Sequence, residues 1–300
     1  MRWLSLLIAV LLSSCVARER STGATHYSTP ILFANPSLPS SAPPTLNRAA
    51  DGSEEEPEQG AKPIPVPEVA QPILPAAVQR STAKGVDLIL LAFDDRRYTL
   101  AVADKAGGPA TQWQTAGDVA RAHRAVAAIN ASFFTPEGKP LGLVIENGKR
   151  FGSWNRRSSL TSGVLAVQGG RPSLSRRDQR HASSGAVHLV QAGPLLLDRG
   201  KVVSGLSASS ARARSFLAFD GDHRWVVGAA ESATLAALSA ALATQPLPGV
   251  LLRTALNLDG GRSSDLWVSS SLQGGPVSTR RFLNKPVRNY ILIKPRPAQP

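Results

Sequence analysis

The stretch Asn257-Leu258-Asp259-Gly260-Gly261-Arg262-Ser263-Ser264-Asp265 places a dense run of polar side chains between two strand-like apolar segments. Its two glycines let the main chain turn sharply and let a ligand approach closely. Asp259 can hold a sugar hydroxyl, a proton or a cation, and Arg262 can form paired hydrogen bonds to a phosphate or a carboxylate. Two interpretations are open at this point: a binding or catalytic site, and a tight Gly-Gly hairpin turn with solvated side chains.

The amino terminus has the pattern of a bacterial lipoprotein signal. Arg2 precedes a short apolar segment, and Leu12-Ser13-Ser14-Cys15 then has the form of a lipobox. The apolar segment is shorter than the roughly 20 residues that span a bilayer. We therefore expect residues 1–15 to be a signal peptide with a lipobox, and Cys15 to carry acyl chains that hold the protein at the cell envelope. In a Gram-negative host, Val16 favours the outer membrane, facing the periplasm. The alternative is a plain secretory signal with a chance cysteine.

Metal and thiol chemistry have few candidate ligands. Cys15 is the only cysteine, so no thiol is left once it is lipidated, which excludes disulfides and cysteine–zinc sites. The five histidines include no close pair at helical metal spacing. We expect no cofactor and no metal. One alternative stays open, a divalent cation held by Asp259 and main-chain carbonyls, although the sequence has no dense carboxylate cluster like a calcium loop.

Composition divides the chain into two parts. Eleven prolines lie between Pro30 and Pro75, and residues 53–58 are an acidic run. Such a composition cannot bury a core, so residues 16–80 are expected to form a disordered tether. Residues 81–300 suffice for one domain and hold 28 basic but only 14 acidic residues. In an exported chain this positive charge favours phosphate-bearing glycans or anionic headgroups over nucleic acid.

Strand patterns dominate this domain. Expected strands are 86–93, 98–102, 125–129, 141–145, 149–151, 164–167, 172–174, 187–190, 195–197, 201–203, 216–219, 224–227, 251–258 and 290–293. Helices are expected at 117–125 and at 232–243, the latter capped by Ser232. The pattern predicts an α+β domain, with a large, mostly antiparallel sheet and few helices packed on it. No glycine-rich loop joins a strand to a helix, so no nucleotide site is expected.

Four further polar segments lie at strand ends. Asn130-Ala131-Ser132 and Gln191-Ala192-Gly193-Pro194 each follow an apolar strand. Arg212 and Arg214 precede another strand, and their spacing places both on one face, where two guanidinium groups suit an anion. Arg288 leads into the last strand. Each segment alone also fits an ordinary turn or a solvated sheet edge.

Taken in order, these segments resemble the phosphodiester glycosidase family. The matching elements are Asn130-x-x-Phe133, Pro140-x-Gly142-Leu143, Gln191-x-Gly193-Pro194, Arg214-Ser215, Asn257 to Ser264, and Val287-x-Asn289. The resemblance covers nearly all of residues 84–294. Arg262 stands where a glycine or small residue is common, and Ala131-Ser132 replaces a glycine-rich pair. These departures bear on the substrate more than on the fold.

The resemblance implies cleavage of a sugar-1-phosphodiester at its glycosidic C–O bond. Asp259 is the expected general base or nucleophile, with Asn130 and Gln191 completing the expected catalytic group. The expected substrate and phosphate contacts are Arg214, Arg262, Ser132, Ser263, Ser264, Gly260, Gly261 and Arg288. The leaving group is a phosphate monoester whose second pKa is about 6, so a phosphate clamp matters more than a second carboxylate.

A competing hypothesis is a non-catalytic tethered module that binds anionic envelope glycans through its basic surface. Convergence of Asp259, Asn130 and Gln191 with the arginines in one concave pocket favours the enzyme. Dispersal of these residues over a broad basic surface favours the binding module.

Overall fold

The computed structural model describes residues 72–179 and 184–297. Cys15, the expected signal peptide and most of the expected tether lie outside these ranges. Within the part that is described, no helix is long and apolar enough to cross a membrane.

The first strand, β1 (Ala77–Ala83), begins inside the segment that was expected to be a tether. Its main chain pairs with β2 (Val86–Asp94) along its whole length, from Ala77 opposite Ala92 to Ala83 opposite Val86. Because β1 is an edge strand with polar, exposed residues such as Arg80, it has no apolar run from which sequence could predict it. The folded part therefore starts before residue 81.

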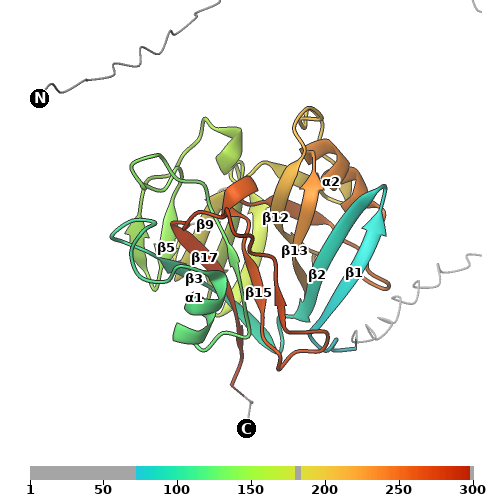
Figure 1. Ribbon diagram of the computed structural model, residues 1–300, viewed down its shortest axis with the longest axis horizontal. Coiled ribbons are helices and arrows are strands. Elements are labelled where there is room, and N and C mark those ends of the chain that lie inside the picture. The colour runs from blue at the N-terminus through green and yellow to red at the C-terminus, as the bar shows by residue number, and fades with distance from the viewer. Residues whose placement is uncertain (1–71, 180–183, 298–300) are drawn as a thin grey trace, which may run out of the picture. The chain divides into compact units, whose positions relative to one another are not determined.

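Three antiparallel sheets make up the fold (Figure 1). The first contains, in order, β1, β2, β13 (Arg224–Ala233), β12 (Arg212–Phe219), β14 (Thr254–Asn257), β10 (Leu195–Asp198) and β11 (Lys201–Val202). The second contains β16 (Val277–Ser278), β15 (Leu266–Val268), β4 (Ala127–Asn130), β17 (Asn289–Pro295) and β3 (Tyr98–Asp104). The third contains β6 (Lys149–Phe151), β5 (Val144–Glu146), β9 (His188–Ala192), β7 (Gly163–Gln168) and β8 (Arg171–Arg176).

The three sheets share one apolar core. Leu217 and Leu256 from the first sheet, Ile129 from the second, and Leu165 and Val190 from the third belong to the same buried cluster. Burying a side chain of this size stabilises the fold by about 1.5–3 kcal/mol. The sheet ends that surround this core are therefore held in fixed relative positions, and polar residues at those ends can form a rigid site.

Two helices cover outer sheet faces. Helix α2 (Leu235–Ala243) buries Leu238 and Leu242 against the first sheet, and helix α1 (Ala116–Ala122) packs Val119 against the second. The described residues also include two 3-10 turns, η1 (Ser159–Thr161) and η2 (Gly261–Ser263).

The helix starts differ from the prediction. Ser232 was expected to cap α2, but it belongs to β13, which pairs with β12 as far as Ala233; Thr234 is the cap and accepts a hydrogen bond from Ala237 N at 3.0 Å. Helix α1 starts at Ala116 because Thr115 forms a capping box with Asp118.

The α+β class and the mostly antiparallel pairing are confirmed. The strands are divided among three sheets, of which the largest has seven strands.

Candidate functional site

The Asp259 stretch connects two different sheets. Strand β14 before it pairs with β10 and β12, whereas β15 after it pairs with β4 and β16. A hairpin requires its two strands to pair with each other, so the interpretation as a Gly-Gly hairpin turn is wrong. The polar stretch instead crosses from one sheet to the next, with η2 in its middle.

Asp259 carries a carboxyl group with unusual acidity. Burial raises its pKa to about 6, while hydrogen bonds from the Ser263 hydroxyl and from Gly260 N, the latter at 2.8 Å from Oδ1, oppose the increase. The residue keeps partial contact with solvent. A carboxyl that titrates near neutral pH and can still meet water is suited to general acid–base catalysis.

Asn130 fixes the main chain of Asp259. Its Nδ2 donates a 2.7 Å hydrogen bond to the Asp259 carbonyl, and its Oδ1 accepts from Ser215 Oγ at 2.6 Å and Asp265 N at 3.0 Å. The side chain is fully buried at the end of β4. Asn130 therefore joins strands from both sheets at this site, and its amide acts on the protein's own groups.

Arg214 lies beside the glycine pair. Its side chain is buried, its Nε donates to Ala233 O at 2.9 Å, and its Nη2 donates to Ser210 O at 2.8 Å. A methyl group on Gly260 would lie 3.8 Å from Arg214 Cδ. Burial, followed by the nearby charge of Arg212, lowers the pKa of Arg214. Among the described residues no carboxylate pairs with Arg214, so its charge is available to an anion.

Arg212 and Arg214 both reach the glycine pair although their exposures differ. A register shift interrupts β12 between them, which leaves Arg212 exposed while Arg214 is buried. A methyl group on Gly261 would lie 3.9 Å from Arg212 Cδ. The two guanidinium-bearing chains thus flank one turn.

Arg262 contacts the segment that precedes the last strand. It is exposed, and its Nε donates to Leu283 O at 2.7 Å while its carbonyl accepts from Lys285 N at 2.9 Å. With Gly261, Arg212 and Arg281, it lines a cavity of about 820 Å³.

Ser264 lines a smaller cavity of about 290 Å³, which shares Ala213, Glu231 and Arg281 with the larger one. Its buried Oγ has no hydrogen-bond partner within the described chain.

Ser132 and Arg288 belong to a buried network at the ends of β3, β4 and β17. Ser132 N and Oγ contact Asn289 Oδ1 at 2.8 and 3.1 Å. Arg288 donates to both carboxylate oxygens of Asp104, with distances of 2.8 to 3.2 Å, and to Gly138 O at 2.9 Å. Arg288 is therefore already neutralised by a buried carboxylate, so it is a weak candidate for binding phosphate.

Gln191 is surrounded by main-chain groups. Its Oε1 accepts from Leu143 N and Asn155 N, both at 2.9 Å, and its Nε2 donates to Asn155 O at 3.1 Å. Gln191 is linked to the Asp259 stretch only indirectly. The carbonyl of Gly193, two residues after Gln191, accepts a 2.9 Å hydrogen bond from Asn257 Nδ2. The structure thus brings Asn130, Gly260, Ser263 and Arg214 to Asp259 and leaves the amide of Gln191 in a different cluster.

Sequence reasoning missed three buried polar residues of this site. Ser215 donates to Asn130, Asn257 connects to Gly193, and Asp265 accepts from Ala116 N at 2.8 Å and Arg280 Nη1 at 3.0 Å. The sequence did mark these residues, because each is a polar residue within or beside a largely apolar strand. Their partners lie far away in the chain and could not be assigned.

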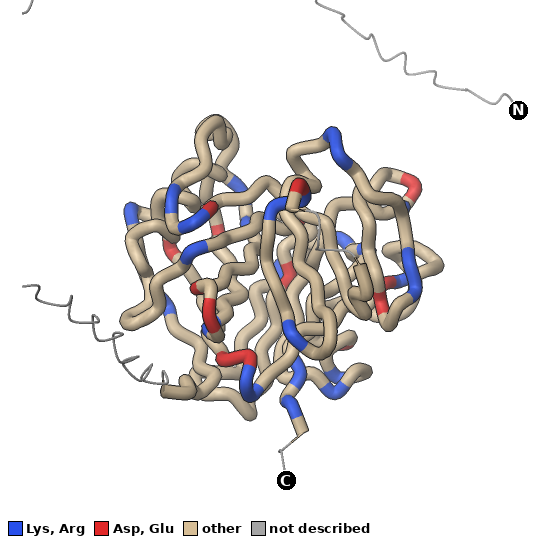
Figure 2. Tube along the Cα trace, turned by 180° about the vertical axis from the view of Figure 1, so that it is seen from behind, with Lys and Arg blue, Asp and Glu red and all other residues tan. Residues whose placement is uncertain are grey.

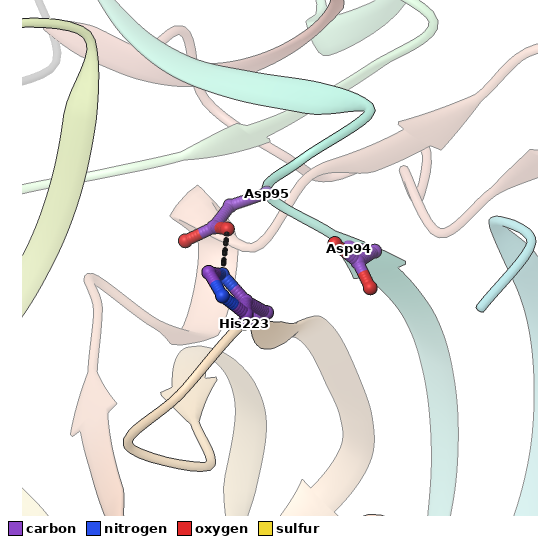
Figure 3. A group of neighbouring side chains, drawn as sticks. All are labelled: Asp94, Asp95 and His223. Carbon is purple, nitrogen blue, oxygen red and sulfur yellow. Dashed lines mark hydrogen bonds and ion pairs between the residues drawn. The ribbon is translucent and has the colours of Figure 1, made fainter. Parts of the chain in front are cut away.

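A group of possible metal ligands lies elsewhere. Asp94 and Asp95, at the end of β2, meet His223 of the β12–β13 turn (Figure 3), and this is the one such group of three in residues 72–179 and 184–297. Each carboxylate oxygen already accepts a hydrogen bond: those of Asp94 from Arg96, and those of Asp95 from Trp225 Nε1 at 3.1 Å and His223 Nδ1 at 2.7 Å. These contacts account for the group without an ion. The register of β12 with β13 places it at the opposite end of β12 from Arg214.

Comparisons with known proteins agree with the fold. A model of the phosphodiester glycosidase family matches residues 123–294. The catalytic domain of zebrafish N-acetylglucosamine-1-phosphodiester alpha-N-acetylglucosaminidase, auto-inhibited by its pro-peptide, is similar with a TM-score of 0.54 and 16% identity, over 76% of this chain and 86% of that one. A hypothetical protein from Synechocystis gives a TM-score of 0.48 and 19% identity, over 73% and 61%. A search of curated proteins found no match.

At these identities the structural likeness shows the fold. The family model, however, covers more than half of the 300 residues and includes Asn130, Gln191, Arg214 and the whole Asp259 stretch. The chain therefore belongs to the phosphodiester glycosidase family.

Proposed function

We propose that the protein hydrolyses a sugar-1-phosphodiester at the bond between the anomeric carbon and the phosphate oxygen. The observation that carries this proposal is the Asp259 carboxyl, whose pKa burial raises to about 6, at a glycine turn flanked by Arg214. Family membership supports the substrate class, and the zebrafish relative is named for a phosphodiester of this kind.

In the proposed reaction Asp259 is the general base. It takes a proton from water as the water oxygen attacks the anomeric carbon; the glycosidic C–O bond breaks, and its electron pair leaves on the phosphate oxygen. The departing phosphate monoester has a second pKa of about 6, so it leaves without strong protonation. Arg214 stabilises the charge of the phosphate. Asn130 is a positioning residue that acts through the main chain of Asp259.

The proposed reaction uses no resident metal ion or cofactor. We expect turnover to continue in the presence of EDTA. Loss of turnover that added Mg²⁺ or Ca²⁺ restores would contradict this part of the proposal.

We further propose that the protein acts in the cell envelope, where a phosphate-bearing glycan is its substrate. The supporting observation is the lipobox pattern that ends at Cys15, through which acyl chains would attach the protein to the membrane. Metabolic labelling with palmitate should mark the full chain and leave Cys15→Ser unlabelled. Labelling of both proteins, or of neither, would contradict lipidation at Cys15.

The experiment that tests the activity is sugar release from a panel of sugar-1-phosphodiesters by the full chain and Asp259→Asn. A matched control is Asp220→Asn, because burial also raises the pKa of Asp220, which accepts main-chain hydrogen bonds at the other end of β12. We expect turnover by the wild type and Asp220→Asn, and its loss in Asp259→Asn. Full activity of Asp259→Asn would contradict the assigned role. No turnover by the wild type, together with binding of anionic glycans, would favour the binding module.

A further inference from the structure

The third sheet carries a basic cavity that the proposed reaction does not use. Its volume is about 890 Å³, within the range of about 300–1,000 Å³ that is usual for ligand sites. The residues that line it are Arg150, Trp154, Arg156, Ser162, Arg176, Arg177, Asp178 and Gln179. Among the described residues, four arginines and a single carboxylate therefore line this cavity.

The arginines of this cavity are unequally neutralised. Arg176 lies 3.4 Å from Asp178 and 3.2 Å from Asp198. Arg177 donates Nη1 to Ser158 O at 2.5 Å and to Thr161 Oγ1 at 3.3 Å, which fixes the side chain without cancelling its charge. Neither Arg150 nor Arg156 has an ion-pair partner in the part of the chain that is described. Guanidinium groups without acidic partners around one concave space raise the local positive potential, which attracts an anion.

Positive charge by itself does not distinguish this cavity from the rest of the molecule. Figure 2 shows Lys and Arg spread over the whole visible trace, with acidic residues between them. What distinguishes the cavity is the combination of concave shape, three arginines without a carboxylate partner, and an indole ring in the wall.

Gln191 holds the loop that forms one wall of the cavity. Gln191 bonds to both main-chain groups of Asn155, the residue between Trp154 and Arg156. The Asn155 side chain in turn donates to Leu141 O at 3.0 Å and accepts from Arg157 N at 3.0 Å. The loop that carries the indole and one of the unpaired guanidinium groups is thus held in place before a ligand arrives, which lowers the entropic cost of binding.

We propose that this cavity binds an anionic glycan, at a site separate from Asp259. Arg150, Arg156 and Arg177 would bind the anionic groups by charge-assisted hydrogen bonds, and the half-buried Trp154 would pack its indole face against a sugar ring. Gln191 positions the loop from behind. The proposal does not depend on the proposed hydrolysis, because none of the described residues that line the cavity is among the hydrogen-bond partners of Asp259.

The test is calorimetric titration of the full chain with dextran sulfate and with neutral dextran of the same length. The cavity variant is Arg150→Gln/Arg156→Gln. The matched control is Arg97→Gln/Arg124→Gln, which removes the same charge at two exposed positions outside the cavity. Thermal unfolding of each variant checks that it folds.

We expect the wild type and the control variant to bind dextran sulfate with similar dissociation constants and the cavity variant to bind at least tenfold more weakly, while neutral dextran does not bind measurably. Equal weakening in the two variants would show that the charge acts diffusely, and it would overturn the proposal. Absence of binding by the wild type, or equal binding of neutral dextran, would overturn it as well. Sugar release by the cavity variant from a small sugar-1-phosphodiester is expected to match the wild type, so this test and that of Asp259 fail independently.

Discussion

The side-chain amide of Asn130 donates a 2.7 Å hydrogen bond to the main-chain carbonyl of Asp259, across 129 residues of sequence. Asn130 ends a strand of the second sheet, and Asp259 follows a strand of the first. This contact and the 2.9 Å hydrogen bond from Asp259 N to Ala131 O join the two sheet ends and fix the main chain of Asp259. Asn130 is better understood as a positioning residue than as a group that meets substrate.

Asn130→Ala is expected to lower the free energy of unfolding by about 2–4 kcal/mol, because it leaves Ser215 Oγ and Asp265 N buried without their acceptor. Ser215→Ala removes one of these contacts and should cost about 1 kcal/mol. Urea unfolding of both single variants and the double variant measures their coupling, which we expect to be about 1 kcal/mol. Strict additivity would show that the two side chains do not act as one unit.

The stability difference between the wild type and Asp259→Asn should depend on pH. Burial raises the pKa of Asp259 from its ordinary 3.8 to about 6, so between these two values the folded state binds more protons than the unfolded state. Wild-type stability therefore falls as pH rises through this window. Relative to Asp259→Asn, it should lose about 1–2 kcal/mol between pH 4 and pH 7, allowing for partial solvent contact. Urea unfolding at several pH values would detect this change, and a constant difference would contradict a raised pKa.

Arg214 and Arg212 form a natural pair for testing the phosphate clamp, because both flank the glycine turn and one is buried whereas the other is exposed. Arg214→Gln should lower kcat/KM for a sugar-1-phosphodiester by about 10²–10³-fold. A preorganised positive charge stabilises the charge of the transition state most strongly in a site shielded from water. Arg212→Gln should lower it by less than about tenfold. Steady-state kinetics on both variants would check this, and the reverse order of effects would move the clamp to Arg212.

Arg288 is expected to matter for stability rather than for substrate binding. Arg288→Met should lower the free energy of unfolding by about 3–5 kcal/mol, because it leaves the buried Asp104 carboxylate without its partner. The double variant Arg288→Met/Asp104→Leu should recover a large part of this loss. If Arg288→Met instead had the wild-type free energy of unfolding and a raised KM, Arg288 would be a phosphate ligand.

Much of the architecture could be predicted from local pattern. The strands from Val86 to Asp94 and from Lys149 to Phe151 were expected almost to the residue, because apolar runs or good turn residues mark them. β1 was not expected, since an edge strand with polar side chains carries no such pattern. The start of α2 was misplaced because β13 continues through Ser232, a tertiary pairing that sequence does not show.

Part of the site was also predictable from local sequence pattern. Asp259 and Asn130 stood out as polar residues at the ends of apolar strands, and they do meet. Gln191 stood out equally, yet its amide supports a loop of the third sheet. Arg288 looked like a free cation because its partner, Asp104, lies on a strand far earlier in the chain. Local pattern identifies polar residues that are out of place, but their roles depend on long-range partners.

The most direct test of the central claim is to identify which bond breaks. The full chain would hydrolyse a sugar-1-phosphodiester in water enriched in ¹⁸O, and ³¹P NMR would then report whether the phosphate monoester product carries the heavy isotope. Attack on the anomeric carbon, with Asp259 as the base, predicts a phosphate product that contains no ¹⁸O from the solvent. A phosphate product that carries the label would mean that the P–O bond is cleaved, and it would contradict the account.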